Sequence, residues 1–346
     1  MATELMKDIY RLEVPLPKNP LKLLNAYLIK GKERNLLIDT GFNRPECEEA
    51  LMSELASLEV DFNKTDIFIT HLHADHSGLL FNIKTDNNIA YCQKLDAAII
   101  NRLSDPVYWN YIVDEFVKTG LRMSPELAIE THPGWLYRPN NNVDLTHVED
   151  GHKIMVGRYT FTCVYTPGHS PGHMCLYEEN EKILFAGDMI LGDITPNLCI
   201  ELYLEYPLTD YLESLDKVEK LDIKHIFVGH RSMLKDVYGR IRELKEHHAA
   251  RCQEALMVLE SGPLDAWEAA VKMTWDIQAK DWNAFPPSQK WFATGEAQAH
   301  LLYLWQIGKV RRKFRDDGVN YFELEDGVPI ERELISAWRK EFKHKK

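Results

Sequence analysis

Short apolar runs alternate with helical patterns through the first two thirds of the chain. Residues 26–29 and 36–38 predict the two strands of a hairpin, and residues 67–69 predict a further strand. Residues 45–58 instead carry Glu, Ala and Leu near helical spacing. Further strand-like runs follow at residues 159–165, 183–187 and 225–228. This alternation is typical of an α/β domain.

The pattern changes near residue 240, after which helices dominate. Residues 240–259 and 264–275 each predict a helix, and residues 292–307 predict a third, capped by Thr294 and ended by Gly308. Two alternating runs around an Asp-Asp-Gly turn then predict a hairpin. Because helices followed by a hairpin resemble a winged helix, we divide the chain into a first domain, 1–239, and a C-terminal winged-helix-like domain, 240–346.

A helical stretch at residues 95–140 interrupts the first domain and is longer than a connecting loop needs to be. It is rich in aromatic side chains, among them Tyr108, Trp109 and Phe116. These predict either a lid that shapes a substrate pocket or a helical pair packed on the core, and the sequence favours neither. His132 is the residue in this insertion whose position relative to a metal site matters most.

Composition and charge narrow the class of protein. The chain has 346 residues, 45% of them hydrophobic, which is enough for a large core. We expect no membrane span and no secretion signal, because no apolar run reaches about 18 residues and the first residues lack an apolar segment. Six scattered cysteines without a C-x-x-C pair indicate reduced thiols and a cytoplasmic location.

The strongest chemical signal is the run at residues 70–78. It places His71, His73, Asp75 and His76 within six residues, directly after a predicted strand. Imidazole and carboxylate are ligands that borderline divalent metals accept. Because a strand alternates its side chains, we expect His71 and His73 to share a face, with Asp75 and His76 on the turn that follows. The spacing differs from the i, i+4 pair of a helical metal motif.

Three later strand ends also deliver metal-competent side chains. The loop after residue 165 holds His169 and His173 between Pro and Gly, and two further apolar runs lead into Asp188 and His230. Loops gather at one edge of a sheet to form sites, so we expect these strand ends to meet.

In this order the motifs resemble those of the metallo-β-lactamase superfamily. The resemblance covers residues 8–235 and includes residues 35–41, which are similar to the superfamily's first motif. It implies an α/β fold of four layers, αββα, and residues 293–301 resemble the C-terminal domain of one bacterial and mitochondrial branch. It also implies two metal sites. The first would be held by His71, His73 and His169, and the second by Asp75, His76 and His230, with Asp188 as the bridge.

Two further residues receive roles from the same resemblance. Asp39 would accept a hydrogen bond from a ligand histidine and fix its tautomer. His173 would buttress its loop without binding a metal.

The resemblance implies a metal-dependent hydrolase, in which water between two divalent ions loses a proton and attacks an acyl or phosphoryl centre. Asp75 and Asp188 would be catalytic by orienting this nucleophile. Zinc is the expected metal, with iron or manganese as alternatives. Because the Pro-Gly-His loop resembles that of glyoxalase II-like thioesterases, we expect a small thioester or ester substrate. Ribonuclease or phosphodiesterase action is the alternative, ahead of lactonase, β-lactamase and iron-dependent persulfide dioxygenase activity.

The net charge and its distribution along the chain indicate which partners the protein can bind. The formal net charge is −12, and the acidic excess lies before residue 240, which disfavours long nucleic acid as a partner. A basic run at residues 309–315 lies in a nearly neutral C-terminal domain. For that domain we therefore favour an interaction or pocket-covering role over nucleic-acid binding. The sequence indicates no oligomeric state.

Overall fold

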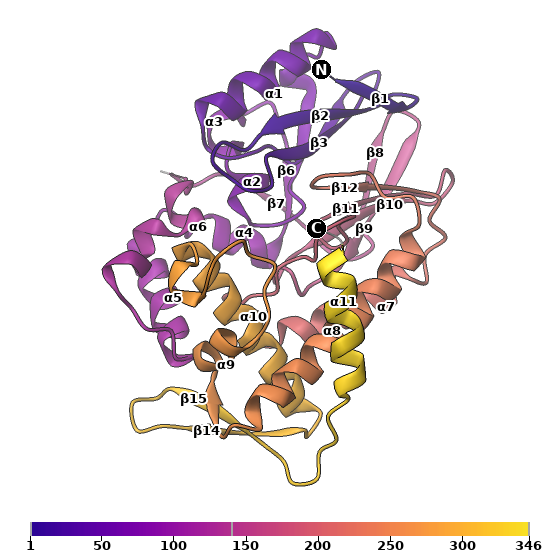
Figure 1. Ribbon diagram of the computed structural model, residues 1–346. Helices are drawn as coiled ribbons and strands as arrows, with labels where there is room; N and C mark the ends of the chain where they lie inside the picture. Colours follow the sequence, from indigo (N-terminus) through magenta and orange to yellow (C-terminus); the bar gives the residue numbers. More distant parts are fainter. Residues whose placement is uncertain (1, 140, 345–346) are drawn as a thin grey trace.

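Two β-sheets pack face to face at the centre of the computed structural model, which describes residues 2–139 and 141–344 (Figure 1). Residues 1, 140, 345 and 346, which include the predicted ends of the insertion and of the C-terminal domain, lie outside the described residues. Within the described ranges, no helix is both long and apolar enough to cross a bilayer.

The first sheet has seven strands in chain order, antiparallel from β1 to β4 and parallel from β4 to β7. The β3–β4 pair confirms the predicted hairpin. Because β4, β5 and β6 run parallel, their carboxyl ends lie at one edge of the sheet. The strands are β1 Thr3–Met6, β2 Ile9–Pro15, β3 Leu23–Ile29, β4 Asn35–Ile38, β5 Thr65–Phe68, β6 Ala90–Gln93 and β7 Thr146–Val148.

The second sheet has five strands in the order β12-β11-β10-β9-β8. They are β8 Lys153–Val156, β9 Tyr159–Tyr165, β10 Met174–Glu178, β11 Ile183–Gly187 and β12 His225–Val228. Buried aromatic side chains such as Phe68, Phe161 and Phe185 fill the space between the two sheets. At the edge where β11 and β12 end, Asn25 N donates to Gly229 O at 2.7 Å and joins the sheets directly.

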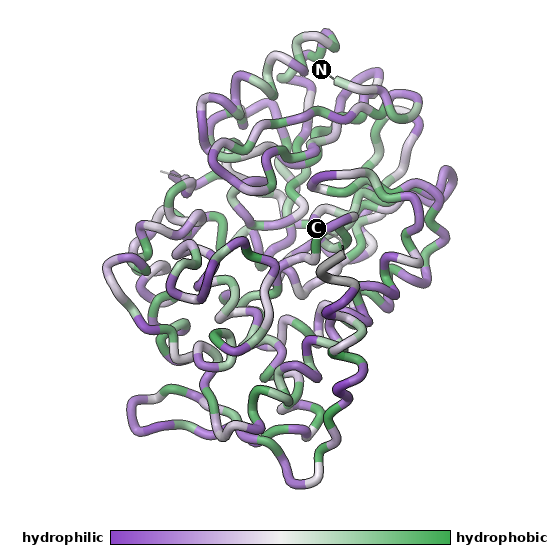
Figure 2. The backbone as a smooth tube through the Cα atoms, viewed as in Figure 1, coloured by the Kyte–Doolittle hydropathy of each residue, from purple (hydrophilic) through white to green (hydrophobic). Residues whose placement is uncertain are grey.

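Helices cover both outer faces. The helices α1 Pro45–Ser57 and α4 Lys94–Ile100 pack on the first sheet, and α5 Pro106–Lys118 adds side chains to the same hydrophobic cluster. The helices α7 Pro207–Val218 and α8 Val237–Leu259 share a cluster with the second sheet, and α10 Pro287–Gln306 packs against both of these helices. In Figure 2 the central strands are mostly hydrophobic and the outer loops mostly hydrophilic. The predicted four-layer αββα fold is therefore confirmed. Single-turn elements are α2 Ala74–Ser77, α3 Leu80–Ile83, η1 Phe62–Lys64, η2 Pro125–Leu127, η3 Ile129–Thr131, α6 Pro133–Leu136 and η4 Trp282–Ala284.

The C-terminal part follows the predicted order of elements with two corrections. The hairpin β14 Val310–Phe314 and β15 Asn320–Leu324 is confirmed, and β13 Leu264–Asp265 pairs with β15 before the short helix α9 Ala266–Lys272. The helix predicted over 264–275 is therefore shorter. α10 begins at Pro287 rather than Phe292, so Thr294 is not a cap. Its hydroxyl donates to Lys290 O at 2.8 Å inside the helix. The last helix is α11 Arg332–His344.

Both halves of the predicted domain division share a hydrophobic core. Side chains from α8 and α10 belong to the same buried cluster as the outer face of the second sheet. Of the aromatic insertion, Tyr108, Trp109 and Phe116 are buried, and the Phe116 and Trp291 rings lie 4.8 Å apart. These side chains pack on the core as the helical-pair interpretation predicts. The boundary at residue 240 and the winged-helix assignment stay predictions.

Candidate metal centre

The carboxyl ends of β5, β9, β11 and β12 meet where the two sheets join. All seven side chains predicted as ligands come together there, in three overlapping groups whose donor atoms lie within 4.8 Å of one another. The groups are His71, His73 and His169; His71, His76 and Asp188; and Asp75, His76 and His230.

Three imidazole nitrogens form the first group. His73 Nδ1 lies 3.0 Å from His71 Nε2 and 3.0 Å from His169 Nε2. The predicted reason for this approach was wrong, because β5 ends at Phe68 and both His71 and His73 lie in the loop beyond it. The loop, rather than strand alternation, turns the two rings toward each other.

The second group contains two imidazoles and a carboxylate. His230 Nε2 lies 3.1 Å from His76 Nε2 and 3.3 Å from Asp75 Oδ2. Asp75 and His76 lie on the single helical turn α2, where the sequence predicted a turn. Asp188 lies between the groups, with Oδ1 3.4 Å from His76 Nε2 and Oδ2 3.5 Å from His230 Nε2 and 3.8 Å from His169 Nε2.

Hydrogen bonds on the outer side of the rings define which nitrogens can bind a cation. His169 Nδ1 donates to Asn197 O at 2.7 Å, and His230 Nδ1 donates to Leu23 O at 2.9 Å. A carbonyl oxygen only accepts, so in the neutral rings both Nε2 atoms carry lone pairs directed into the centre. Asp188 Oδ1 is buried beside them with no hydrogen-bond partner. Converging lone pairs and an unpartnered carboxylate oxygen fit a divalent cation.

The electrostatic environment favours the same interpretation. Burial, together with neighbouring histidines, lowers the pKa of His73 to about 3 and that of His71 well below its ordinary value. Burial opposes ionisation of Asp75, but the hydrogen bond from His230 lowers its pKa to about 2. Burial lowers the pKa of His76, yet Asp39 and Asp188 raise it well above the ordinary value. The carboxylates therefore create a field that attracts positive charge.

Two residues outside the ligand set take the places that the resemblance implied. Asp39 Oδ2 lies 2.8 Å from His76 Nδ1, and its oxygens accept from the backbone and hydroxyl of Thr70. His173 belongs to none of the three groups of donors. Its Nδ1 lies 2.8 Å from Thr166 Oγ1, and its Nε2 accepts from the backbone N of Asp188 at 3.2 Å. Both therefore support neighbours of the centre.

Sequence reasoning missed the role of Asp96, a buried residue of α4. Its carboxylate accepts from Leu72 N at 2.8 Å, Ser170 Oγ at 2.6 Å and Gly172 N at 2.6 Å, and so ties together the two loops that carry His71, His73 and His169. Burial raises the pKa of Asp96 to about 7, although these three donors oppose the shift. The sequence signal that could have identified Asp96 was its position just after β6, at the sheet edge where the predicted metal ligands lie.

Asp96→Asn is expected to weaken zinc binding about 10- to 100-fold, the usual effect of changing a partner outside the ligand set. The new amide group must face either Gly172 N–H or the donors Leu72 and Ser170, so one loop loses its acceptor. Competition with a chromogenic chelator measures the affinity. Asp86→Asn, on an exposed loop, is the matched control. Equal zinc affinity in the Asp96 variant and the wild-type protein would contradict the assigned role.

A second missed feature is the irregular segment between β11 and α7. It supplies the Asn197 carbonyl that fixes His169, and it places Glu201 Oε1 3.9 Å from His73 Nε2. Tyr108 donates to Glu201 Oε2 at 3.3 Å. The segment packs against α10, where a Cβ added to Gly295 would lie 2.0 Å from Cys199 Sγ. Helix α10 therefore holds this segment against the metal centre.

Gly295→Ala should consequently conflict with Cys199, and Cys199→Ala should relieve the conflict. Urea unfolding of both single variants and the double variant gives the interaction free energy, which we expect to be about 1–3 kcal/mol, because overpacking a tight contact has that cost. Zinc affinity should fall in Gly295→Ala and recover in the double variant. Strictly additive changes would show that the contact does not constrain the segment.

His132, singled out in the sequence, lies away from these groups. Its ring packs 5.7 Å from that of Trp291 and 5.6 Å from that of Phe292, and burial lowers its pKa to about 4. Its contacts join the insertion to α10.

Comparison with known proteins agrees with this geometry. A family profile described as the metallo-beta-lactamase superfamily matches residues 22–230, and another, described as the C-terminal domain of metallo-beta-lactamase-like proteins, matches residues 283–325. The chain belongs to the metallo-beta-lactamase superfamily.

Individual proteins are also similar to this chain in sequence or in structure. A metallo-beta-lactamase family protein of Thermus thermophilus is 29% identical, with a TM-score of 0.80 over 93% of this chain and 100% of that chain. The beta-lactamase-like protein 2 homolog of Caenorhabditis elegans is 29% identical over 68% of this chain and 65% of its own length. The atrochrysone carboxyl ACP thioesterase of Aspergillus fumigatus is 24% identical over 68% of this chain and 60% of its own length. The chain thus matches less than two thirds of the last two proteins.

Proposed function

We propose that the protein is a hydrolase with a dinuclear metal centre that acts on a thioester or a small ester. The observation that carries this proposal is the position of Asp188, whose Oδ2 lies 3.8 Å from His169 Nε2 in one group and 3.5 Å from His230 Nε2 in the other. A structural zinc site closes with four ligands. Six donors around one shared carboxylate are instead typical of two adjacent ions.

Two divalent ions, zinc or alternatively iron or manganese, would supply a water nucleophile at neutral pH and polarise the substrate carbonyl. The first would be held by His71, His73 and His169, and the second by Asp75, His76 and His230, with Asp188 shared. The ionised carboxylates of Asp75 and Asp188 would accept hydrogen bonds from the attacking water and orient it. Asp75 is the more accessible of the two, with a side chain 14% exposed, and would receive the proton.

The surroundings of the centre favour an acyl group over a polyanion. Glu201, beside His73, brings no positive charge that could bind a phosphate, and burial raises its pKa to about 8, so the carboxyl group is mostly neutral at pH 7. Nearby, Tyr111 on the helix of Tyr108 and Tyr203 just after Glu201 expose large apolar side chains. The likeness to a protein named as an ACP thioesterase supports a thioester as the bond that is cut.

Much of the positive charge in the basic run of the C-terminal hairpin is already paired with carboxylates of the same fold. Arg311 pairs with Glu323 at 2.9 Å and with Glu325 at 2.8 Å, and Arg315 pairs with Asp265 at 2.9 Å. Charges matched within the fold release few counterions on binding a phosphate backbone. We therefore keep a small-molecule substrate as the proposal.

The test compares zinc-loaded protein on octanoyl-N-acetylcysteamine thioester and on a single-stranded RNA oligonucleotide. We expect turnover of the thioester, loss of turnover after dialysis against a chelator, and recovery on adding zinc. RNA cleavage without thioester hydrolysis would overturn the proposed substrate class. Absence of both activities in protein that has bound its metals would overturn the proposed function.

A further inference from the structure

Four of the five predicted ligand histidines share one arrangement of their ring nitrogens: Nδ1 lies within 3.0 Å of an oxygen outside the centre, and Nε2 faces the other ligands. His73 is reversed, because its Nδ1 faces the first group and its Nε2 points away from it. An imidazole that binds a metal almost always donates its other N–H to an oxygen, so His73 Nε2 requires an acceptor. The four other pairs are His71 with Thr70 Oγ1, His76 with Asp39 Oδ2, His169 with Asn197 O and His230 with Leu23 O.

The side chain that faces His73 Nε2 is that of Glu201. Its Oε1 lies 3.9 Å from this nitrogen, and its Oε2 lies 3.3 Å from the hydroxyl of Tyr108. Both facing side chains are mostly buried, with exposed fractions of 29% for His73 and 17% for Glu201. The separation exceeds a hydrogen bond by about 1 Å, and such contacts are often long until a site is filled. A small rotation of the two side chains is sufficient to close it.

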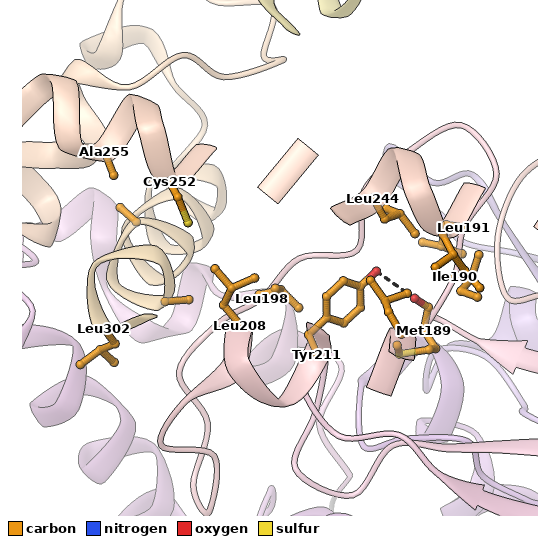
Figure 3. Close-up of a cluster of buried hydrophobic side chains, with 14 of the residues drawn as sticks. Met189, Ile190, Leu191, Leu198, Leu208, Tyr211, Leu244, Cys252, Ala255 and Leu302 are labelled. Atoms are coloured by element: carbon orange, nitrogen blue, oxygen red, sulfur yellow. Dashed lines mark hydrogen bonds between the residues drawn. The ribbon is translucent and has the colours of Figure 1, made fainter. Parts of the chain in front are cut away.

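The irregular segment between β11 and α7 fixes the backbone of Glu201 from both sides. Before it, Leu198 is fully buried and belongs to the cluster that Figure 3 shows around Tyr211 of α7. After it, Leu204 is buried and its backbone N donates to Glu201 O at 3.0 Å, which closes a tight turn. The carbonyl that accepts from His169 Nδ1 lies on the same segment. One anchored segment therefore faces two of the three histidines in the first group.

From these positions we infer that Glu201 is a positioning residue for His73, an inference that rests on the metal centre of the proposed function. A neutral imidazole that binds a metal through Nδ1 carries its proton on Nε2, and Glu201 Oε1 accepts the hydrogen bond from it. Oε1 can accept whether or not the carboxyl group is ionised, because the proton of the neutral acid can lie on Oε2, toward Tyr108. The acceptor thereby fixes the tautomer and the orientation of the ring.

This role concerns the first metal ion and not the second. The outer nitrogens of His76 and His230, in the second group, contact Asp39 and the Leu23 carbonyl. Asp39 follows β4 and Leu23 begins β3, so neither lies on the segment that carries Glu201. Loss of the Glu201 carboxyl group should therefore weaken the binding of one ion and leave the other unchanged.

The experiment measures the stepwise zinc affinities of the full chain by competition with a chromogenic chelator. In Glu201→Leu, we expect one of the two zinc ions to bind about 10- to 100-fold more weakly and the other to bind as in the wild-type protein. Glu201→Gln should stay within about threefold of wild type for both ions, because its amide oxygen still accepts from His73 Nε2. Glu205→Leu, at an exposed position of the same segment, is the matched control and should keep both affinities.

The imidazole proton gives a second readout, which a merely structural role of Glu201 would not move. In zinc-loaded protein labelled with ¹⁵N-histidine, NMR should find His73 protonated on Nε2. This proton should exchange slowly with water in the wild-type protein and in Glu201→Gln, and faster in Glu201→Leu. Equal zinc affinities in Glu201→Leu and the wild type, or equal weakening in both Glu201 variants, would overturn the inference and leave the proposed function intact. Wild-type protein that binds no zinc would overturn both.

Discussion

Replacing Asp188 by alanine is expected to lower kcat/KM by on the order of 10³-fold, because loss of the bridge removes about 4 kcal/mol of transition-state stabilisation by the ions. The carboxylate lies within 3.8 Å of His76, His169 and His230, so its removal weakens both groups of donors at once. At least one ion per chain should also be lost. Steady-state kinetics and elemental analysis of the same preparation measure the two effects.

Asp222→Ala is the matched control for this prediction. Asp222 has a side chain 70% exposed and forms a surface ion pair with Lys182, an interaction worth about 0–1 kcal/mol. Its kcat/KM should stay within about twofold of the wild-type value. An Asp188→Ala protein that retained both ions and wild-type kinetics would show that the carboxylate does not bridge the centre.

Gly168→Ala is expected to produce the largest loss of stability. Gly168 has φ +130°, and a Cβ there would lie 2.5 Å from the backbone N and Cα of Tyr211. Backbone strain and a clash that no side-chain rotation relieves should together lower the free energy of unfolding by about 3 kcal/mol or more. The neighbouring His169 would be displaced from its group. Urea unfolding and zinc titration measure these effects.

Gly151→Ala separates the two causes. Gly151 also has a positive φ, +81°, but nothing lies within 4 Å of the added Cβ. The Gly151→Ala variant should therefore lose only about 1–2 kcal/mol of its free energy of unfolding, the cost of a left-handed backbone conformation, and should keep its zinc affinity. If both variants were destabilised equally, the close approach of Tyr211 would have no energetic weight.

The proposed ligands could be located from the sequence because each follows a strand that its apolar run makes visible. β5, β9, β11 and β12 all end close to where the patterns at 67–69, 159–165, 183–187 and 225–228 predicted. A sheet collects the ends of such strands at one edge, so the order of the motifs along the chain predicts that side chains from these four strand ends come together.

Other parts of the centre depend on contacts that no local pattern records. Asp96 lies in a helix, and only the fold brings it within hydrogen-bond distance of Leu72 and Gly172. Glu201 lies in a segment between β11 and α7 with no helix or strand of its own. Thr294 has the side chain of a cap, but the helix begins earlier, at Pro287, where the ring favours the first turn.

The most direct test of a dinuclear hydrolase is the dependence of activity on zinc stoichiometry. Metal-free protein, prepared by dialysis against a chelator, is titrated with zinc while thioester hydrolysis is followed. The structure supports two groups of donors on one carboxylate, so activity should rise until about two equivalents of zinc per chain are bound and then stay constant. A plateau at one equivalent, or activity that is independent of added metal, would contradict the account.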